Sequence, residues 1–296
     1  MKKKLLAIST KMRQNLIFAL LAAFLILPSL SVVGWVKDFR LIDSRKVGNV
    51  QRLQTRAMDA NAKPSLFNEP LVSVTFDDGW ESIYTTAFPL LQKYGIRSTQ
   101  YIISGELKEK EYMSVAQIKA MQQNGHDVAC HSVSHVDLVI QTDDELTAQL
   151  KDCKDTLSKV FGQINDFASP YGSANDKTRK EISKYFRTQR NTVGDISDNI
   201  SDADVNTAKN FNQYDIIATT IRRDTSVAQI KQLLDYATKN NAWVVLTYHQ
   251  IDDGASQYGL DAKLLEEQLK AISEYKARIV TVNDVMNSLP AQKRSK

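Results

Sequence analysis

The sequence predicts an α/β protein in which parallel strands alternate with helices. Three observations lead to this prediction. Short β-rich apolar runs recur from residue 70 onward, a stretch with helical periodicity follows most of them, and several end directly before residues capable of chemistry. Such alternation is typical of a parallel sheet covered by helices, whose strands all end at one edge of the sheet or barrel. We therefore expect a barrel-like fold with its functional site at that edge.

The predicted sheet begins with the apolar run 71–76, which has the length and continuous hydrophobicity of a buried strand. A helix over 82–94 follows and ends at Gly95, a residue type that commonly closes helices. Residues 98–103 are rich in β-branched and aromatic side chains, which predicts the second strand. These elements form one strand–helix–strand unit.

The next two helices are marked by capping boxes, in which two side chains three positions apart bond the first free backbone groups of a helix. Ser114 with Gln117 starts a helix that ends at Gly125, and Thr142 with Glu145 starts another. An apolar stripe at helical spacing follows the second box: Leu146, Leu150, Cys153, Leu157 and Val160. The remaining predicted elements are strands 127–130, 167–169, 242–248 and 278–281 and helices 176–185, 226–239 and 261–276.

Charge and hydrophobicity divide the 296 residues into four parts. Residues 1–40 carry a net charge of +6 and the remainder carries −2, so no basic stripe on the body indicates nucleic acid. In 1–36, basic residues precede an uncharged apolar stretch long enough to span a bilayer. We expect 1–36 to be a cytoplasmic basic end with a signal anchor or signal peptide, 37–69 a linker, 70–290 the globular domain and 291–296 a tail.

Two fates of the N-terminal segment remain open. Ser29-Leu30-Ser31 is an acceptable processing site for a cleaved signal peptide. The apolar run continues to Val36, which favours an uncleaved anchor. Both alternatives put the globular domain outside the cytoplasm, either anchored to the membrane by one helix or secreted.

The chain has two cysteines, Cys130 and Cys153. An exported protein could pair them in a disulfide, but the sequence does not give the distance between them. Cys153 falls on the apolar stripe of a predicted helix, where a buried thiol is an ordinary filler. We therefore expect free thiols.

Two adjacent carboxylates follow the first predicted strand, in Thr75-Phe76-Asp77-Asp78-Gly79. They repel each other at neutral pH and have no basic neighbour in sequence, so the fold must supply positive charge, most simply as a divalent metal. His131 and His135, two of only four histidines, offer matching ligands. Each motif alone has an ordinary explanation, a turn for the carboxylates and a helix face for the histidines. Together they predict a metal-dependent hydrolase.

Four motifs occur in an order and spacing that resemble the NodB-homology polysaccharide deacetylases, the fourth carbohydrate esterase family. They are residues 75–79, the run from His131 to Leu138, Ser169-Pro170-Tyr171-Gly172 and Leu246-Thr247-Tyr248-His249, and the resemblance covers about 71 to 286. It implies a distorted (β/α) barrel, preceded here by an N-terminal hydrophobic helix. It also implies a divalent metal, typically zinc, held by Asp78, His131 and His135.

The resemblance further implies a role for each remaining motif residue. Asp77 would be the general base that takes a proton from metal-bound water, and His249 the general acid that protonates the departing amine. The backbone N–H of Tyr171 would stabilise the oxyanion together with the metal. Pro170 and Leu246 would contact the substrate.

Two features of the family are missing. Ala168 stands where an arginine is usual, two residues before Pro170, and no Asp followed by Trp occurs in 187–200. Arg190 could supply the guanidinium from the next strand. At an assumed ~5 Å and a dielectric constant of ~20, a dication attracts Asp77 by roughly 6 kcal/mol and an arginine by about half that. The metal alone would then keep the base ionised, and the arginine would mainly orient it.

We therefore expect an extracytoplasmic, metal-dependent hydrolase that removes N-acetyl groups from a cell-envelope or extracellular polysaccharide. One alternative is a non-catalytic glycan-binding module that has lost its arginine. Another is a deformylase or deacetylase of a lipid-linked sugar at the membrane surface. The expected partners are the polysaccharide and, through the N-terminal helix, the membrane, whereas no nucleic acid and no protein partner is predicted.

Overall fold

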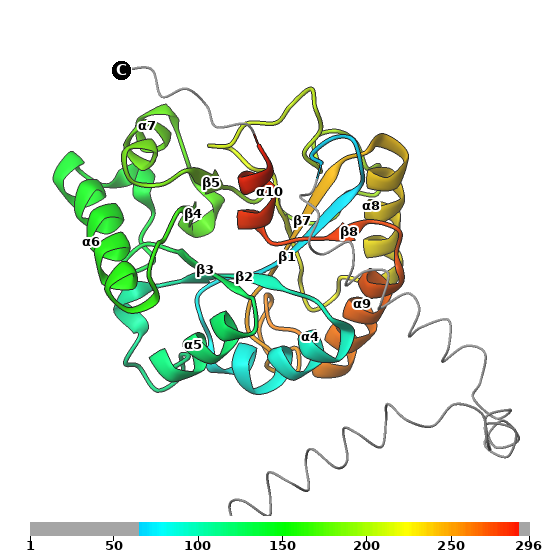
Figure 1. Cartoon of the computed structure of the whole chain (residues 1–296), viewed down its shortest axis with the longest axis horizontal. Helices are drawn as coiled ribbons and strands as arrows, with labels where there is room; N and C mark the ends of the chain where they lie inside the picture. Colours follow the sequence, from blue (N-terminus) through cyan, green and yellow to red (C-terminus); the bar gives the residue numbers. More distant parts are fainter. Residues whose placement is uncertain (1–64, 290–296) are drawn as a thin grey trace, which may run out of the picture. The chain divides into compact units, whose positions relative to one another are not determined.

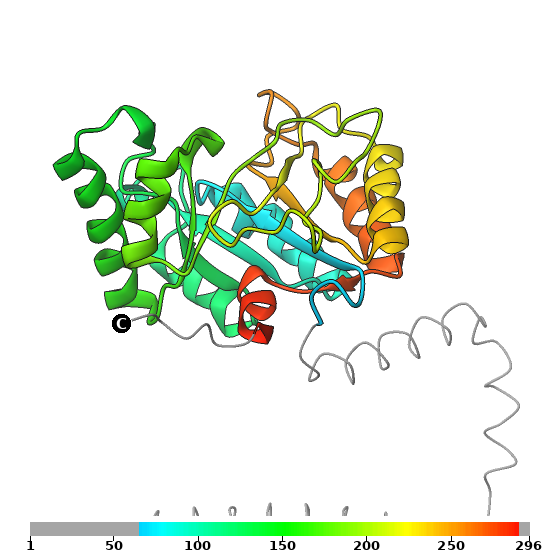
Figure 2. The same ribbon diagram turned by 90° about the horizontal axis from the view of Figure 1, so that it is seen from above.

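The computed structural model describes residues 65–289. Within them, eight parallel strands form a curled barrel, and helices α4 to α9 lie around its outside (Figure 1, Figure 2). This architecture confirms the predicted distorted (β/α) barrel. The strands are β1 (Leu71–Phe76), β2 (Ser98–Ile102), β3 (Asp127–Cys130), β4 (Asp166–Ala168), β5 (Thr188–Arg190), β6 (Thr219–Thr220), β7 (Trp243–Tyr248) and β8 (Arg278–Ile279). The α-helices are α4 (Phe88–Tyr94), α5 (Val115–Gln123), α6 (Asp143–Phe161), α7 (Asp176–Tyr185), α8 (Val227–Asn240), α9 (Ala262–Glu274) and α10 (Val282–Ser288).

The order of the strands is β5-β4-β3-β2-β1-β7-β6, and β8 pairs with the start of β1. Residues 216–220 connect the two ends of this order. On one side the chain beyond β5 bonds to them, with Asn191 N–H donating to the carbonyl of Ile216 (3.0 Å) and Val193 N–H to that of Ala218 (2.9 Å). On the other side β6 pairs with β7. The strands therefore close around an interior, and their carboxyl ends meet in one place.

Two apolar cores stabilise this barrel. The larger lies between the strands and the surrounding helices and takes alternate residues of each strand, such as Val72, Val74 and Phe76 of β1. The smaller fills the barrel interior, where Leu71, Trp243 and Val245 pack against α10. Helix α10 is tied to the starts of neighbouring strands, for example by an ion pair between Arg97 and Asp284 (2.6 Å). It therefore covers the end of the barrel opposite the carboxyl ends of the strands.

The predicted elements agree with the structure to within a few residues, because their signals are local. Both capping boxes form as expected, at Ser114 and at Thr142. The helix expected over 82–94 is divided into a π-helical turn, η2 (Ile83–Ala87), and α4. The short strand β6 and helix α10 were not predicted.

The predictions for 1–36, for most of the 37–69 linker and for the 291–296 tail concern residues outside those described. Among residues 65–289, no helix combines the length and the apolar character that crossing a membrane requires.

The prediction of free thiols is wrong. Cys130, at the end of β3, and Cys153, on α6, form a disulfide, with their Cα atoms 6.3 Å apart. That separation is within the usual range for disulfides. Cys153 does lie on the buried stripe of its helix, as expected, but the stripe packs against the end of β3. At that contact Cys153 meets Cys130, with which it forms the disulfide.

Candidate active site at the carboxyl ends of the strands

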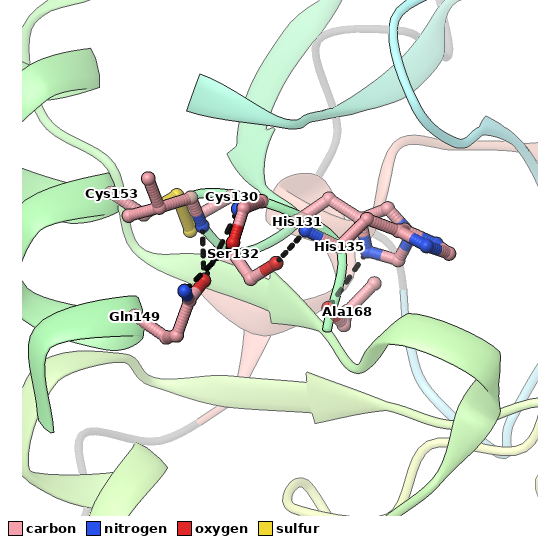
Figure 3. The surroundings of a disulfide bond; sticks show 9 residues. Cys130, His131, Ser132, His135, Gln149, Cys153 and Ala168 are labelled. Carbon is pink, nitrogen blue, oxygen red and sulfur yellow. Dashed lines mark hydrogen bonds between the residues drawn. A yellow bond between two sulfur atoms is a disulfide. The ribbon is translucent and has the colours of Figure 1, made fainter. Parts of the chain in front are cut away.

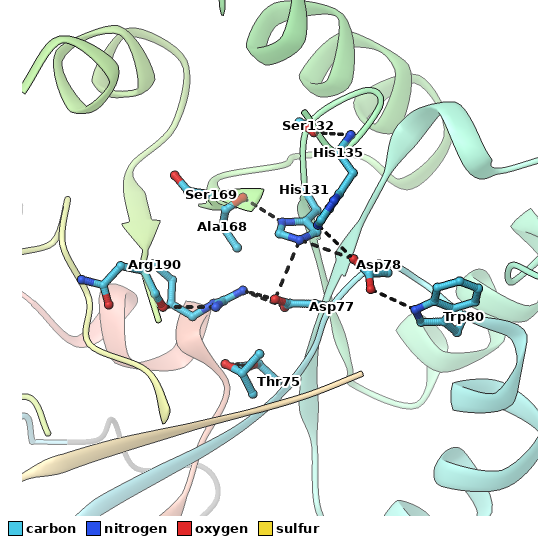
Figure 4. A network of polar contacts seen from close by, with 12 residues as sticks. Thr75, Asp77, Asp78, Trp80, His131, Ser132, His135, Ala168, Ser169 and Arg190 are labelled. Atoms are coloured by element: carbon cyan, nitrogen blue, oxygen red, sulfur yellow. Dashed lines mark hydrogen bonds and ion pairs between the residues drawn. The ribbon is translucent and has the colours of Figure 1, made fainter. Parts of the chain in front are cut away.

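The predicted site residues named below lie at the carboxyl ends of four strands of the barrel. Figure 4 shows Asp77, Asp78, His131, His135 and Arg190 close together. Asp77 and Asp78 follow β1 and His131 follows β3, while Arg190 is the last residue of β5. His249 follows β7. Because parallel strands all end on the same side, residues far apart in the chain become neighbours here.

Asp78, His131 and His135 form a compact set of potential metal ligands. One ligand atom from each residue lies within 4.8 Å of those from the other two. The Oδ1 atom of Asp78 is 3.6 Å from His131 Nε2 and 3.4 Å from His135 Nε2. This oxygen is buried and accepts no hydrogen bond in the described part of the chain. A buried carboxylate oxygen facing two imidazole nitrogens is an arrangement that a divalent cation would complete.

The hydrogen bonds made by the other polar atoms of His131 and Asp78 leave one atom of each residue free to bind a metal. The carbonyl of Ala168 accepts a hydrogen bond from His131 Nδ1 (2.9 Å), so the Nε2 atom that faces Asp78 carries the free lone pair. Burial lowers the pKa of His131, which favours the neutral imidazole that binds metals. Trp80 Nε1 donates to Oδ2 of Asp78 (2.9 Å) and leaves Oδ1 available. The donor set therefore fits a divalent cation.

Backbone strain is concentrated at this site. Seven non-glycine residues of the described chain have positive φ angles, and four of them are Asp78 (70°), Ser132 (65°), His135 (53°) and Tyr171 (61°). A non-glycine residue in this region costs on the order of 1 kcal/mol or more, and such strain is found at functional sites held by their surroundings. The concentration is independent evidence that this end of the barrel carries the function.

Asp77 lies beside the ligand set and is bound by Arg190. The Nη2 atom of Arg190 is 2.7 Å from Oδ1 and 2.5 Å from Oδ2 of Asp77, and both side chains are buried. Burial by itself would raise the pKa of Asp77, but the charge of Arg190, assisted by His131 and His249, lowers it below the ordinary value. Asp77 is therefore a carboxylate at neutral pH.

The position of Arg190 depends on an aromatic ring and two small residues. Its guanidinium lies 4.9 Å from the ring centre of Tyr101, a cation–π distance. Tyr101 packs with Ala129 and Ala168, whose small side chains leave room inside the barrel. Arg190 thus supplies a guanidinium from β5, next to the strand on which the sequence has Ala168.

His249 and Tyr171 lie at the rim of the site. The ring of His249 is half-buried and 5.2 Å from that of Tyr258, while its Nδ1 atom is buried and has no hydrogen-bond partner among residues 65–289. The ring of Tyr171 is 68% exposed and meets His135 edge-on at 4.6 Å. Tyr171 itself lies in the turn η5 (Pro170–Gly172).

Both residues expected to contact the substrate, Leu246 and Pro170, are buried. Leu246 is fully buried in the core between strands and helices, so the prediction that it lines the substrate pocket is wrong. Side chains alternate along a strand, and the site-facing neighbour is Thr247, which bonds Thr75 of β1 (3.2 Å). Pro170 is also buried and begins the turn that presents Tyr171.

Several residues that shape the site were not predicted. Trp80 could have been suspected, because it is only two positions after Asp78. Tyr101, Tyr258 and the carbonyl of Ala168 carry no signal in the sequence. These groups reach the site because of the order and register of the strands in the sheet.

Comparison with known proteins shows which family part of this chain resembles. Residues 66–188 match the family model described as polysaccharide deacetylase. The chain is 32% identical over 123 residues to YxkH of Bacillus subtilis, covering 41% of this chain and 43% of that protein. It is 29% identical over 118 residues to a peptidoglycan-N-acetylglucosamine deacetylase of Bacillus cereus, covering 38% and 54%. The chain thus spans about half the length of these relatives.

A third relative is the poly-beta-1,6-N-acetyl-D-glucosamine N-deacetylase of Staphylococcus aureus, 29% identical over 137 residues, which cover 41% of this chain and 47% of that one. Among solved structures, the deacetylase PplD of Streptococcus pyogenes, in complex with acetate, is 26% identical with a TM-score of 0.51, over 61% of this chain and 76% of that chain. The Xyl-CE4 domain of a xylanase from the hindgut metagenome of Trinervitermes trinervoides shares the fold. Its TM-score is 0.53 at 18% identity, over 74% of this chain and 91% of that chain.

Proposed function

We propose that this protein, which carries a polysaccharide deacetylase domain by the match of residues 66–188, is a metal-dependent hydrolase that removes N-acetyl groups from a cell-wall or extracellular polysaccharide. The observation that carries the proposal is the convergence of Asp78, His131 and His135 beside the buried pair of Asp77 and Arg190. The relatives named for acting on N-acetylglucosamine polymers support this class of substrate.

Asp78, His131 and His135 would hold the metal, for which we propose zinc because one carboxylate and two imidazoles suit that ion. When bound, a divalent cation supplies Lewis acidity for the amide carbonyl and makes water more acidic. Only three protein ligands are offered by the described residues, so open positions remain for water and substrate.

Asp77 would accept the proton of the attacking water. Arg190 supports this role in two ways, because it keeps the carboxylate ionised and fixes its orientation through contacts to both oxygens. His249 would donate a proton to the departing amine, which is a poor leaving group when unprotonated. The backbone N–H of Tyr171 would stabilise the negative charge that develops on the carbonyl oxygen.

The proposal also includes the cellular location of the enzyme. We infer from the basic and apolar composition of residues 1–36 that the domain acts outside the cytoplasm, held to the membrane by an N-terminal helix or secreted after cleavage. Its partners would then be the polysaccharide and, for the anchored form, the membrane.

The test uses the full-length protein with poly-β-1,6-N-acetylglucosamine, peptidoglycan glycan strands and an N-acetylated lipid-linked sugar, and measures acetate release. We expect release from a polymer, loss of release after chelation, recovery on adding zinc, and loss in Asp77→Asn. A rate that neither chelation nor the substitution alters would refute the proposal. If acetate is released only from the lipid-linked sugar, that sugar and not a polysaccharide would be the proposed substrate.

One observation favours a second candidate, a glycan-binding module without catalysis. The buried Nδ1 atom of His249 has no partner in the described chain, so no carboxylate there orients the imidazole as an acid. Binding of glycan with no acetate release, and with unchanged affinity in His249→Ala, would support the module over the enzyme.

A further inference from the structure

The loop that carries both histidine ligands, residues 131–135, is attached to helix α6 at two points (Figure 3). The first is the disulfide between Cys130, which directly precedes the loop, and Cys153 of α6. The second is the side chain of Gln149, four residues earlier on α6 and therefore on the same face of the helix.

Gln149 bonds the backbone of the loop. Its Oε1 atom accepts hydrogen bonds from the N–H groups of Val133 (2.9 Å) and Ser134 (3.2 Å). Its Nε2 atom donates to the hydroxyl of Ser134 (2.8 Å). One side chain thus satisfies two consecutive backbone donors between the histidines. On the opposite edge of the loop, Ser104 and Gly105 donate to its carbonyl groups.

The loop needs such support because its conformation is strained. Ser132 and His135 both have left-handed backbone angles, which an unsupported loop would tend to leave. The two ligands also differ in how they are held. His131 is fixed by its own hydrogen bond to Ala168, whereas the His135 ring makes no hydrogen bond in the described residues. The His135 ring lies 3.4 Å from Oδ1 of Asp78 and makes edge-on contacts with the rings of His131 and Tyr171. Because these contacts lack a directional hydrogen bond, the position of His135 also depends on the backbone of the loop.

We propose that Gln149 is a positioning residue for the metal ligands and that it acts together with the Cys130–Cys153 disulfide as a brace on loop 131–135. The inference deepens the proposed function and rests on it, since it takes Asp78, His131 and His135 as the metal ligands. It follows that loss of either attachment weakens metal binding, including loss of the disulfide by reduction.

The experiment measures the Kd of the full-length protein for Zn²⁺ by competition with a chromophoric chelator at fixed pH. We expect Gln149→Leu to weaken binding by about tenfold or more, the effect usual when a group behind a metal ligand is lost. Gln149→Glu keeps an acceptor for both N–H groups and should stay within about threefold of the unsubstituted protein. Cys130→Ala/Cys153→Ala should also weaken binding. Gln123→Leu, the same change at an exposed position of α5, is the matched control and should have no effect.

The outcomes separate the inference from the proposed function. If the unsubstituted protein does not bind Zn²⁺, the metal site itself is refuted, and the brace with it. If it binds Zn²⁺ and Gln149→Leu binds equally well, the brace alone is refuted. Gln149 is only partly buried, so we expect Gln149→Leu to fold. Its Zn²⁺ affinity therefore tests the brace even if Cys130→Ala/Cys153→Ala fails to fold. A positioning role also requires that excess Zn²⁺ restore acetate release in Gln149→Leu, which a collapsed site would not allow.

Discussion

Arg190 and Asp77 form a buried ion pair in which Nη2 of the arginine contacts both carboxylate oxygens, at 2.7 and 2.5 Å, across 113 residues of sequence. In the sheet, Arg190 is paired directly with Ala168 of β4, the position at which the resemblance leads us to expect an arginine. The guanidinium therefore reaches the base from the neighbouring strand at the same level of the barrel. This relationship gives the first prediction.

Replacing Arg190 by Ala should reduce acetate release by about 100-fold, because the base loses the contact that orients it. It should also lower the free energy of unfolding by about 3 to 5 kcal/mol, since a buried carboxylate is left unpaired. Both are measurable, by an acetate assay and by urea unfolding. Because Ala168 is the register partner, Ala168→Arg/Arg190→Ala should recover at least part of the activity. Full activity in Arg190→Ala would contradict the role.

Tyr101 should matter through its ring and not through its hydroxyl group, which has no hydrogen-bond partner in the described chain. Tyr101→Phe keeps the ring 4.9 Å from the Arg190 guanidinium and should retain activity. Tyr101→Leu removes a cation–π contact worth about 2 kcal/mol in a desolvated setting and should lower kcat by roughly tenfold. KM should be unchanged, because neither residue is at the rim. Equal kcat values for the two variants would show that the ring does not position Arg190.

Trp80 should tune the metal ligand Asp78 through a single hydrogen bond. Trp80→Phe removes the indole N–H that donates to Oδ2 at 2.9 Å but keeps an aromatic ring to stack on Tyr112. We expect the Kd for Zn²⁺ to rise about 10-fold or more, as is typical when the partner of a ligand is lost. Tyr112→Phe, which keeps the stack and the indole, is the control. Unchanged Zn²⁺ affinity in Trp80→Phe would argue against this role.

Asp127, at the start of β3, should make stability depend on pH without touching the site. Burial raises its pKa to about 6 in the folded protein, above the unfolded value of 3.8. Between these pH values the folded state binds more protons than the unfolded state, so this carboxyl costs stability as pH rises through the window. Asp127→Asn removes that cost. The variant's gain in unfolding free energy over the unsubstituted protein should grow from pH 4 to pH 6 and stay constant above it. Urea unfolding at several pH values measures this gain, and a gain independent of pH would contradict it.

Much of this protein was predictable from short stretches of sequence. Strand runs, capping boxes such as Thr142 with Glu145, and the motifs after Phe76 and Cys130 depend on neighbours a few residues apart. They determined the alternation of strands and helices. They also determined that Asp77, Asp78, His131 and His249 would follow strand ends, and hence that the site would form at one end of a barrel.

The tertiary structure decided the contacts between distant residues. It paired Cys130 with Cys153, turned Leu246 toward the helices, and brought Arg190 and Tyr101 together around Asp77. Each of these depends on which strands are neighbours, on their register, and on which face of a strand or helix points inward. Local patterns carry none of that information, because a shift of one residue in register reverses the direction of every side chain in a strand.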